Sequence, residues 1–430
     1  MSEKYWWEEV EEKMRAYQRA DPANLPGAVF AVETPRSGRL ISSVGDGWNT
    51  NAICAIASMT KPFTATALLL ALEERGLLDI EMPVFELEGM ELYSRDEMKR
   101  KIRVRHLLQH TSGLLSFQHY KKGPATRCND PEGASPCCAD LDEPTGSTSE
   151  WTGSPGITNE CIHVDGRCRP ARGASLEAVS EFVMQAYSPA FEPGTDSSYS
   201  TYAFTVAARA VEMLTGESIN RYLRSKVFEP LGMEDSFFVA EKSGDDEVDR
   251  RITEGVSEEK RARVADVTLI TQDGELPEEI APGRDGRWDK LRRGWKYIFP
   301  EGGMYSTAED LLAYLAMLRD GGMSRGRPVL SEEIVRLLVK DQGFGHTMGF
   351  GYAEKKNRYG NGVGTLSHLG RFMTYIWYDP GQDNPVIGVF LSQRLTNLFA
   401  VRNLAEGTRV IFSEFVPLVT KSVSEVFAEV

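Results

Sequence analysis

Ser58 and Lys61 form an S-x-x-K motif at the start of an apolar stretch. Side chains three residues apart lie on one face of a helix. A serine hydroxyl is a weak nucleophile until a base takes its proton, and lysine can be that base where burial and nearby cations favour its neutral form. Free N–H groups at a helix start would also stabilise developing negative charge. The pair predicts acyl transfer through serine, although an N-cap role explains Ser58 by itself equally well.

A second S-x-x-K match, Ser257 with Lys260, lies inside a run of mixed charge over residues 241–260. A lysine in such surroundings stays solvated and protonated, so it cannot serve as a base. We expect this run to be a solvated loop or an exposed helix, without a catalytic role.

Two other residues, Tyr199 and His368, have side chains that could take part in acyl transfer. Tyr199 opens a Tyr-Ser-Thr sequence after a turn at residues 191–195, and it could act as a phenolate base beside a lysine ammonium. His368 lies on a predicted strand near Gly364 and Gly370, and strand glycines often mark close approach to a ligand. A structural tyrosine and a structural histidine are the alternatives for these two positions.

The elements that must position these residues follow from hydrophobic pattern and turn chemistry. Residues 57–75 predict a buried helix. Strands are predicted at 27–33, 39–45, 364–369, 374–378 and 386–392, and the other helices at 1–20, 103–108, 176–187, 202–215, 307–320 and 403–419. Strands at both ends of the chain, with helices between, predict an α/β (α+β) fold. We expect one antiparallel sheet from the terminal strands, flanked by helices, plus a mostly helical lobe with the site in the cleft.

The chain has 430 residues and a net charge of −14, which argues against a nucleic-acid binder and against docking on anionic membranes. No apolar run reaches the ~18 residues of a membrane helix, and no signal peptide is recognised. We therefore expect a cytoplasmic protein, unless a leader was removed. One catalytic domain is expected over residues 1–430, with an α/β lobe at about 1–57 and 295–430 and a helical lobe at about 58–294.

Residues 116–175 predict a long loop of turn-forming composition. Such a segment buries too little apolar surface to order itself, so we expect disulfides or a structural zinc with His163 to hold it. Both remain open. Removing this insertion should leave Ser58 reactive and alter substrate preference. The segment contains five of the six cysteines: Cys128, Cys137, Cys138, Cys161 and Cys168.

The ordered motifs resemble those of the serine β-lactamase and penicillin-binding-protein superfamily, in its class C β-lactamase-like branch. The S-x-x-K pair, the tyrosine element and the His368-Leu-Gly370 strand occur in the order of that group. Residues 104–114, 191–195 and 302–311 also look like segments of the branch. The resemblance covers roughly residues 27–392. The nearest members look like carboxylesterases and D-aminopeptidases.

The resemblance implies a role for each matching residue. Ser58 would be the acylated nucleophile, Lys61 would share its proton network, and Tyr199 would be the general base. His368 would take the place of the strand lysine or histidine. The oxyanion hole would be the backbone N–H groups of Ser58 and Arg371.

Substrate contacts are implied at Thr201, Gly370 and Arg371. Thr201 departs from the asparagine that β-lactamases carry there, which weakens the expectation of β-lactam recognition. His368 replaces the strand lysine, as in the esterase and D-peptidase branches.

These observations predict a serine hydrolase that acts through an acyl-enzyme on an ester or small amide, first of all a carboxylesterase. A peptidase or amidase of D-aminopeptidase type, or a peptide acyltransferase, is the alternative within enzymes. A non-catalytic binding homologue is the alternative of another class, and the intact Ser58, Lys61 and Tyr199 set argues against it. No cofactor or catalytic metal is implied, and the expected partner is a small ester or amide. The sequence does not fix the oligomeric state.

Overall fold

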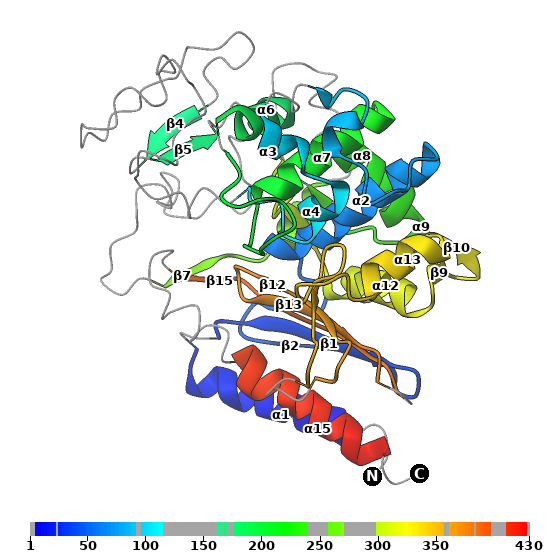
Figure 1. The fold of residues 1–430 in the computed structure, drawn as a ribbon. Helices are drawn as coiled ribbons and strands as arrows, with labels where there is room; N and C mark the ends of the chain where they lie inside the picture. Colours follow the sequence, from blue (N-terminus) through cyan, green and yellow to red (C-terminus); the bar gives the residue numbers. More distant parts are fainter. Residues whose placement is uncertain are drawn as a thin grey trace.

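Figure 1 shows the computed structural model of the chain. It describes residues 5–22, 25–91, 96–114, 161–164, 167–170, 175–186, 188–238, 257–270, 298–356, 361–381, 384–396 and 410–427.

A six-stranded antiparallel sheet joins the two ends of the chain, in the order β11-β12-β13-β14-β1-β2. The two ends of the chain meet in the pairing of β1 (Ala28–Thr34) with β14 (Val386–Ser392), in which Phe30 lies opposite Phe390. The expected sheet of N- and C-terminal strands is confirmed. Its other strands are β2 (Gly38–Val44), β11 (Gly351–Tyr352), β12 (Leu366–Gly370) and β13 (Thr374–Asp379).

Helices α1 (Tyr5–Ala20) and α15 (Val416–Phe427) cover one face of the sheet (Figure 1). An aromatic cluster fills the interface. The Trp7 ring lies 5.5 Å from that of Phe30, which lies 5.4 Å from Phe415. Burying such rings stabilises the fold by both apolar area and edge contacts. A π-helical turn η8 (Val410–Phe415) leads into α15.

The opposite face packs on α12 (Ala308–Arg319), and the helical part lies beyond it. The centre of that part is α2 (Lys61–Glu74), which packs against α7 (Tyr202–Thr215) and is buried all round from Lys61 to Leu72. The surrounding helices are α3 (Glu97–Arg100), α4 (Val104–Leu108), α6 (Leu176–Ala186), α8 (Ile219–Leu223), the π-helical turn η6 (Arg224–Phe228), α9 (Glu229–Leu231), α11 (Glu258–Arg263) and α13 (Glu332–Val339).

Several pairs and one triplet of short strands lie outside the six-stranded sheet. A three-stranded sheet has the order β3-β8-β6, with β3 (Cys54–Ala55), β8 (Met304–Ser306) and β6 (Phe237–Phe238). The other pairs are β7 (Thr268–Ile270) with β15 (Arg394–Thr396), β9 (Met323–Ser324) with β10 (Arg327–Pro328), and β4 (Cys161–Val164) with β5 (Arg167–Pro170). Among the described residues, no helix has both the length and the apolar character that crossing a bilayer requires.

Three sequence expectations need correction. The helix predicted at 57–75 begins with a 3₁₀ turn, η1 (Ala57–Thr60), and becomes α-helical only at Lys61. The C-terminal helix ends at Phe427, later than the predicted 419, and its predicted start falls outside the described residues. Helix α13 was not predicted, although Ser331 caps it by accepting the N–H of Ile334.

Most of the insertion at 116–175 lies outside the described residues, apart from β4 and β5, and so does the pairing of its cysteines. Most of the charged run 241–260 also lies outside. The described part of that run begins at Ser257, which caps α11. The lobe boundaries stay a prediction.

Candidate active site

Hydrogen bonds within the turn and to a distant segment stabilise the turn that carries Ser58. Ala57, the residue before it, has a φ of +49°, a left-handed conformation that costs a non-glycine residue energy. The Thr60 hydroxyl stabilises the turn by donating to the Ala57 carbonyl at 2.7 Å and accepting the N–H of Met304 at 3.2 Å. Ser58 itself is half-buried and makes no capping bond in this turn, so the N-cap explanation is wrong.

The Lys61 ammonium is fully buried behind the serine. Its Nζ donates to Ser58 Oγ at 3.3 Å and to the Glu301 carbonyl at 2.8 Å. It also lies 4.8 Å from the ring centroid of Tyr199 and 5.6 Å from that of Phe204. A buried cation is costly without such partners, and these hydrogen bonds and aromatic faces offset its desolvation.

Tyr199 lies at the mouth of the site, with 37% of its surface exposed. Its ring packs at 4.5 Å from the ring of His110 and lies 6.5 Å from that of His368. The structure therefore brings together the four residues that the sequence singled out, Ser58, Lys61, Tyr199 and His368, from segments far apart in the chain. Their catalytic roles remain predictions.

His368 sits on β12 with its Nδ1 3.1 Å from the Leu369 carbonyl. Burial, assisted by the positive charge of Lys61, lowers its pKa to about 3. The ring is therefore neutral at neutral pH. It cannot supply the positive charge that a lysine would bring to the same strand position.

The low pKa of His368 makes the stability of the protein depend on pH. An unfolded histidine takes up a proton below about pH 6.5, whereas the folded one does so only near pH 3. Stability is thus full above about pH 6.5 and is lost as the pH falls. We expect the fall in unfolding free energy between about pH 7.5 and about pH 5 to be about 2 kcal/mol larger in wild type than in His368→Gln. Urea unfolding at both pH values measures this, and equal losses would contradict it.

The C-terminal end of β12 lies against the nucleophile segment. A Cβ atom added to Gly370 would lie 2.4 Å from the Ile56 carbonyl oxygen, so only glycine fits there. Thr374 Oγ1 donates to the same carbonyl at 3.1 Å. Arg371 follows on the exposed side, and Thr201 is half-buried at the start of α7. Gly370 and Arg371 therefore lie where β12 packs against the turn that carries Ser58, and Thr201 lies at the start of α7, the helix that packs on α2.

Two further histidines line this region, and the sequence analysis gave neither a role. His110 is buried with a φ of +62°, and its Nδ1 accepts the N–H of Ser200 at 3.0 Å. Its ring lies 5.3 Å from that of His346. Burial lowers the pKa of both rings, with the charges of His346 and Lys61 adding to the effect on His110. His110 lies in segment 104–114, which resembles a segment of the class C β-lactamase-like branch. That resemblance was the sequence signal that could have indicated a role for His110. In the part of the chain that the structure describes, no group of three histidine, cysteine or acidic residues is placed to hold a metal ion.

A family model described as Beta-lactamase matches residues 14–410. The chain belongs to the beta-lactamase family. This family of serine hydrolases includes esterases, amidases and penicillin-binding proteins. The resemblance stated from the motifs is confirmed.

Curated relatives of this beta-lactamase family protein are distant. It is 24% identical to Penicillin-binding protein 4 of Amycolatopsis lactamdurans over 322 residues, which is 73% of this chain and 65% of that protein. It is 28% identical to Esterase EstB of Burkholderia gladioli over 326 residues, which is 73% of this chain and 69% of the esterase. The match to the first of these spans less than two thirds of that relative's length.

Two solved structures share the fold. One is EstCE1, described as a hydrolase with promiscuous acyltransferase activity, with a TM-score of 0.63, 18% identity, and coverage of 96% of this chain and 98% of that one. The other is the D-amino acid amidase of Ochrobactrum anthropi SV3, with a TM-score of 0.58, 18% identity, and coverage of 97% and 99%. At these identities the likeness concerns the fold alone.

Proposed function

We propose that this serine hydrolase is a carboxylesterase that works through an acyl-enzyme on Ser58. The observation that carries the proposal is the contact of a buried lysine with a half-buried serine at 3.3 Å, under a tyrosine at the mouth of the site. Acyl transfer requires a nucleophile held beside the group that takes its proton, and Lys61 contacts both Ser58 and the ring of Tyr199.

In the first step, Ser58 Oγ attacks the ester carbonyl carbon while its proton passes to the Tyr199 oxygen, which acts as a phenolate beside the Lys61 ammonium. The carbonyl oxygen becomes an oxyanion, which accepts hydrogen bonds from the backbone N–H groups of Ser58 and Arg371. Collapse of this intermediate breaks the bond to the alcohol, and Tyr199 gives the held proton to the departing alkoxide. Water then attacks the acyl-serine carbonyl and gives a proton to Tyr199, the bond from the acyl carbon to Ser58 Oγ breaks, and Oγ takes that proton as the acid is released.

Several features favour an ester over an amide or a β-lactam. An alkoxide leaves more readily than the anion of an amine, so the leaving group of an ester needs less protonation and orientation. Thr201 lacks the amide group that would grip a β-lactam side chain. His368 is buried and neutral, so the strand supplies no cation for a substrate carboxylate. D-amino-acid amidase, peptidase and peptide acyltransferase activities remain the alternatives within enzymes.

The first test is substrate preference. We expect p-nitrophenyl esters of short acids to be turned over with higher kcat/KM than nitrocefin or D-amino-acid amides. Initial rates on a panel of these compounds measure this, with the Ser58→Ala protein as the background. Nitrocefin hydrolysis as efficient as ester hydrolysis would overturn the preference for esters. A panel without any turnover would favour the non-catalytic alternative.

His110 provides a second test, because it holds the tyrosine segment through Ser200 and packs on the Tyr199 ring. His110→Ala removes the acceptor and is expected to lower kcat by about tenfold to 100-fold, since misplaced catalytic groups lose orientation. His110→Asn keeps an acceptor near the Nδ1 position and tolerates the left-handed backbone, so it should recover most of the rate.

The matched control for this test is His106→Asn. His106 is also buried, and its Nδ1 also accepts a backbone N–H, that of Arg103 at 3.2 Å, but this bond is made to the N-cap of its own helix α4 and not to the tyrosine segment. The His106→Asn variant should alter the stability of the protein and leave kcat within about twofold of the wild-type value. Equal rates for His110→Ala and wild type would show that His110 does not position the tyrosine.

A further inference from the structure

A cavity of about 400 Å³ lies outside the Ser58 site, and none of Ser58, Lys61, Tyr199 or His368 lines it. It is partly open to solvent and is lined by residues of α8, η6, α9, β6, α11 and the turn between β9 and β10. Its volume is in the range of small-molecule sites. Three buried apolar side chains and three basic ones line it: Phe228, Met233, Phe237, Arg224, Lys260 and Arg325.

The charges at this cavity differ from the balance of the whole chain. Two carboxylates, Glu229 and Glu234, also line it, so the lining has one positive charge in excess while the chain carries −14. Arg224 Nε is 3.2 Å from Glu229 Oε1, and Lys260 Nζ donates to the Glu234 backbone carbonyl. Neither contact involves Arg325, so its guanidinium is the group best placed to take an anion.

The backbone at Arg325 is strained. Arg325 has a φ of +50° and Gly326 a φ of +75°, and together they form the two-residue loop of the β9–β10 hairpin. Such loops favour asparagine followed by glycine. An arginine in the left-handed region costs roughly 1–2 kcal/mol, and strain of this kind is concentrated at functional sites.

This turn holds the arginine against the cavity wall. A Cβ atom added to Gly232 would lie 2.6 Å from Arg325 Nη2, so the guanidinium rests on the bare backbone of this glycine. Gly232 has a φ of +70° as the C-cap of α9. The close approach and the left-handed conformation both require glycine there.

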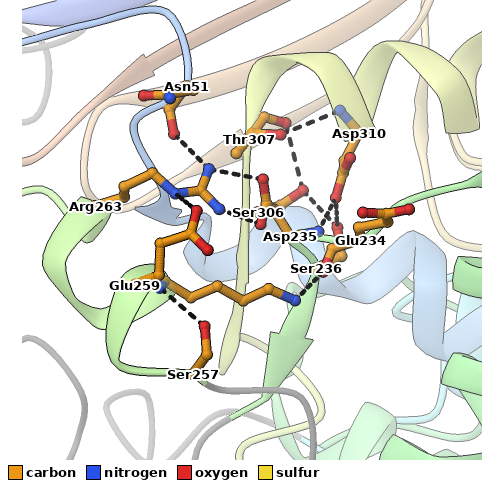
Figure 2. Close-up of polar contacts among 11 residues, drawn as sticks. Asn51, Glu234, Asp235, Ser236, Ser257, Glu259, Arg263, Ser306, Thr307 and Asp310 are labelled. Atoms are coloured by element: carbon orange, nitrogen blue, oxygen red, sulfur yellow. Dashed lines mark hydrogen bonds and ion pairs between the residues drawn. The ribbon is translucent and has the colours of Figure 1, made fainter.

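A hydrogen-bond network holds another part of the lining in place (Figure 2). Arg263 Nη1 and Nη2 bind the two carboxylate oxygens of Asp235 at 2.8 and 2.5 Å, which anchors the helix that carries Lys260. Ser236 Oγ donates to Asp310 at 2.8 Å, which anchors the strand that carries Phe237. A site already held in place loses less entropy when a ligand binds.

We propose that this cavity binds a small organic anion, a carboxylate with a short apolar body. The carboxylate would pair with Arg325 at the rim, where a planar guanidinium matches its two oxygens. The apolar body would lie beside Phe228, Met233 and Phe237, which belong to the lining of the cavity. An inorganic anion would leave this apolar part of the lining without a partner, and a neutral alcohol would leave the guanidinium unpaired. The site is independent of the proposed esterase activity.

The test is calorimetric titration of the full chain with hexanoate, beside acetate, phosphate and hexanol. We expect hexanoate to bind with the highest affinity. Arg325→Asn should weaken its binding at least about tenfold, because it removes a charge-assisted hydrogen bond, and should leave ester turnover unchanged. The same variant should raise the unfolding midpoint, since asparagine suits the turn, so lost binding cannot be ascribed to misfolding.

Arg327→Asn is the matched control. Arg325 and Arg327 are both exposed, but Arg327, two residues further along the hairpin, is not among the residues that line the cavity, so hexanoate should bind this variant as it binds wild type. Binding that persists unchanged in Arg325→Asn would overturn the proposal. Phosphate or hexanol binding as tightly as hexanoate would refute the ligand class. Repeating the titration after fluorophosphonate treatment separates binding in this cavity from binding of the product acid at Ser58. If the reagent does not label the protein, the effect of Arg325→Asn on hexanoate binding still shows whether the cavity is the site.

Discussion

Ser58→Ala is expected to abolish both turnover and covalent labelling by a fluorophosphonate. Its hydroxyl lies 3.3 Å from the ammonium of a fully buried lysine, and no other atom of the proposed mechanism can form the acyl bond. Loss of a nucleophile removes the covalent path, so the expected fall in rate reaches the background. Intact-protein mass spectrometry detects the adduct on wild type, and peptide mapping assigns it.

Ser257→Ala is the control, since this serine belongs to the second S-x-x-K match. Ser257 Oγ accepts the N–H of Lys260 at 3.2 Å and caps α11, so the variant should lose about 1 kcal/mol of local stability and keep full labelling. An acyl adduct in the Ser58→Ala protein would show that the nucleophile lies elsewhere.

Tyr199→Phe is expected to lower kcat by roughly 10²–10⁴, the usual contribution of a general acid–base group. The ring would still pack on His110 and face the Lys61 ammonium, and the hydroxyl belongs to a partly exposed residue, so the fold should be unchanged. Stopped-flow measurement of acylation and deacylation on a p-nitrophenyl ester separates the two steps that the tyrosine serves.

Tyr202→Phe controls for loss of a tyrosine hydroxyl nearby. Tyr202 is buried three residues after Tyr199, in the first turn of α7. The Tyr202→Phe variant should therefore keep kcat within about twofold of wild type. If Tyr199→Phe keeps near-wild-type kinetics, another group accepts the serine proton.

Local signals predicted much of the fold. Helix α7 has the predicted bounds of 202–215, because its apolar pattern is continuous and Gly216 takes the left-handed cap that ends it. Strand β14 also has its predicted bounds, 386–392, since a run of β-branched and aromatic residues is typical of a central strand. The order of the motifs then indicated the family and which residues to compare.

The geometry of the site depends on contacts that sequence spacing does not encode. Ala57 adopts its left-handed conformation where the neighbouring Ile56 N–H pairs with the carbonyl of Met304, far away in the chain. His110 gains its position through the N–H of Ser200, on a different segment. Arg325 meets the bare backbone of Gly232 only because two separate turns pack together. Such contacts between distant segments override local propensity.

The pairing of β1 with β14 has a consequence for how the chain is made. Ala28 pairs with Ser392, so the sheet cannot close until the residues up to Ser392 have left the ribosome. The contacts between α2 and α7 join segments that emerge much earlier, and sheets made of distant segments form slowly. A nascent chain that ends before β12 would already contain Ser58 and Lys61 but not the strand that packs on their turn. The candidate active site would thus be completed only after the strands that follow residue 366 have been made.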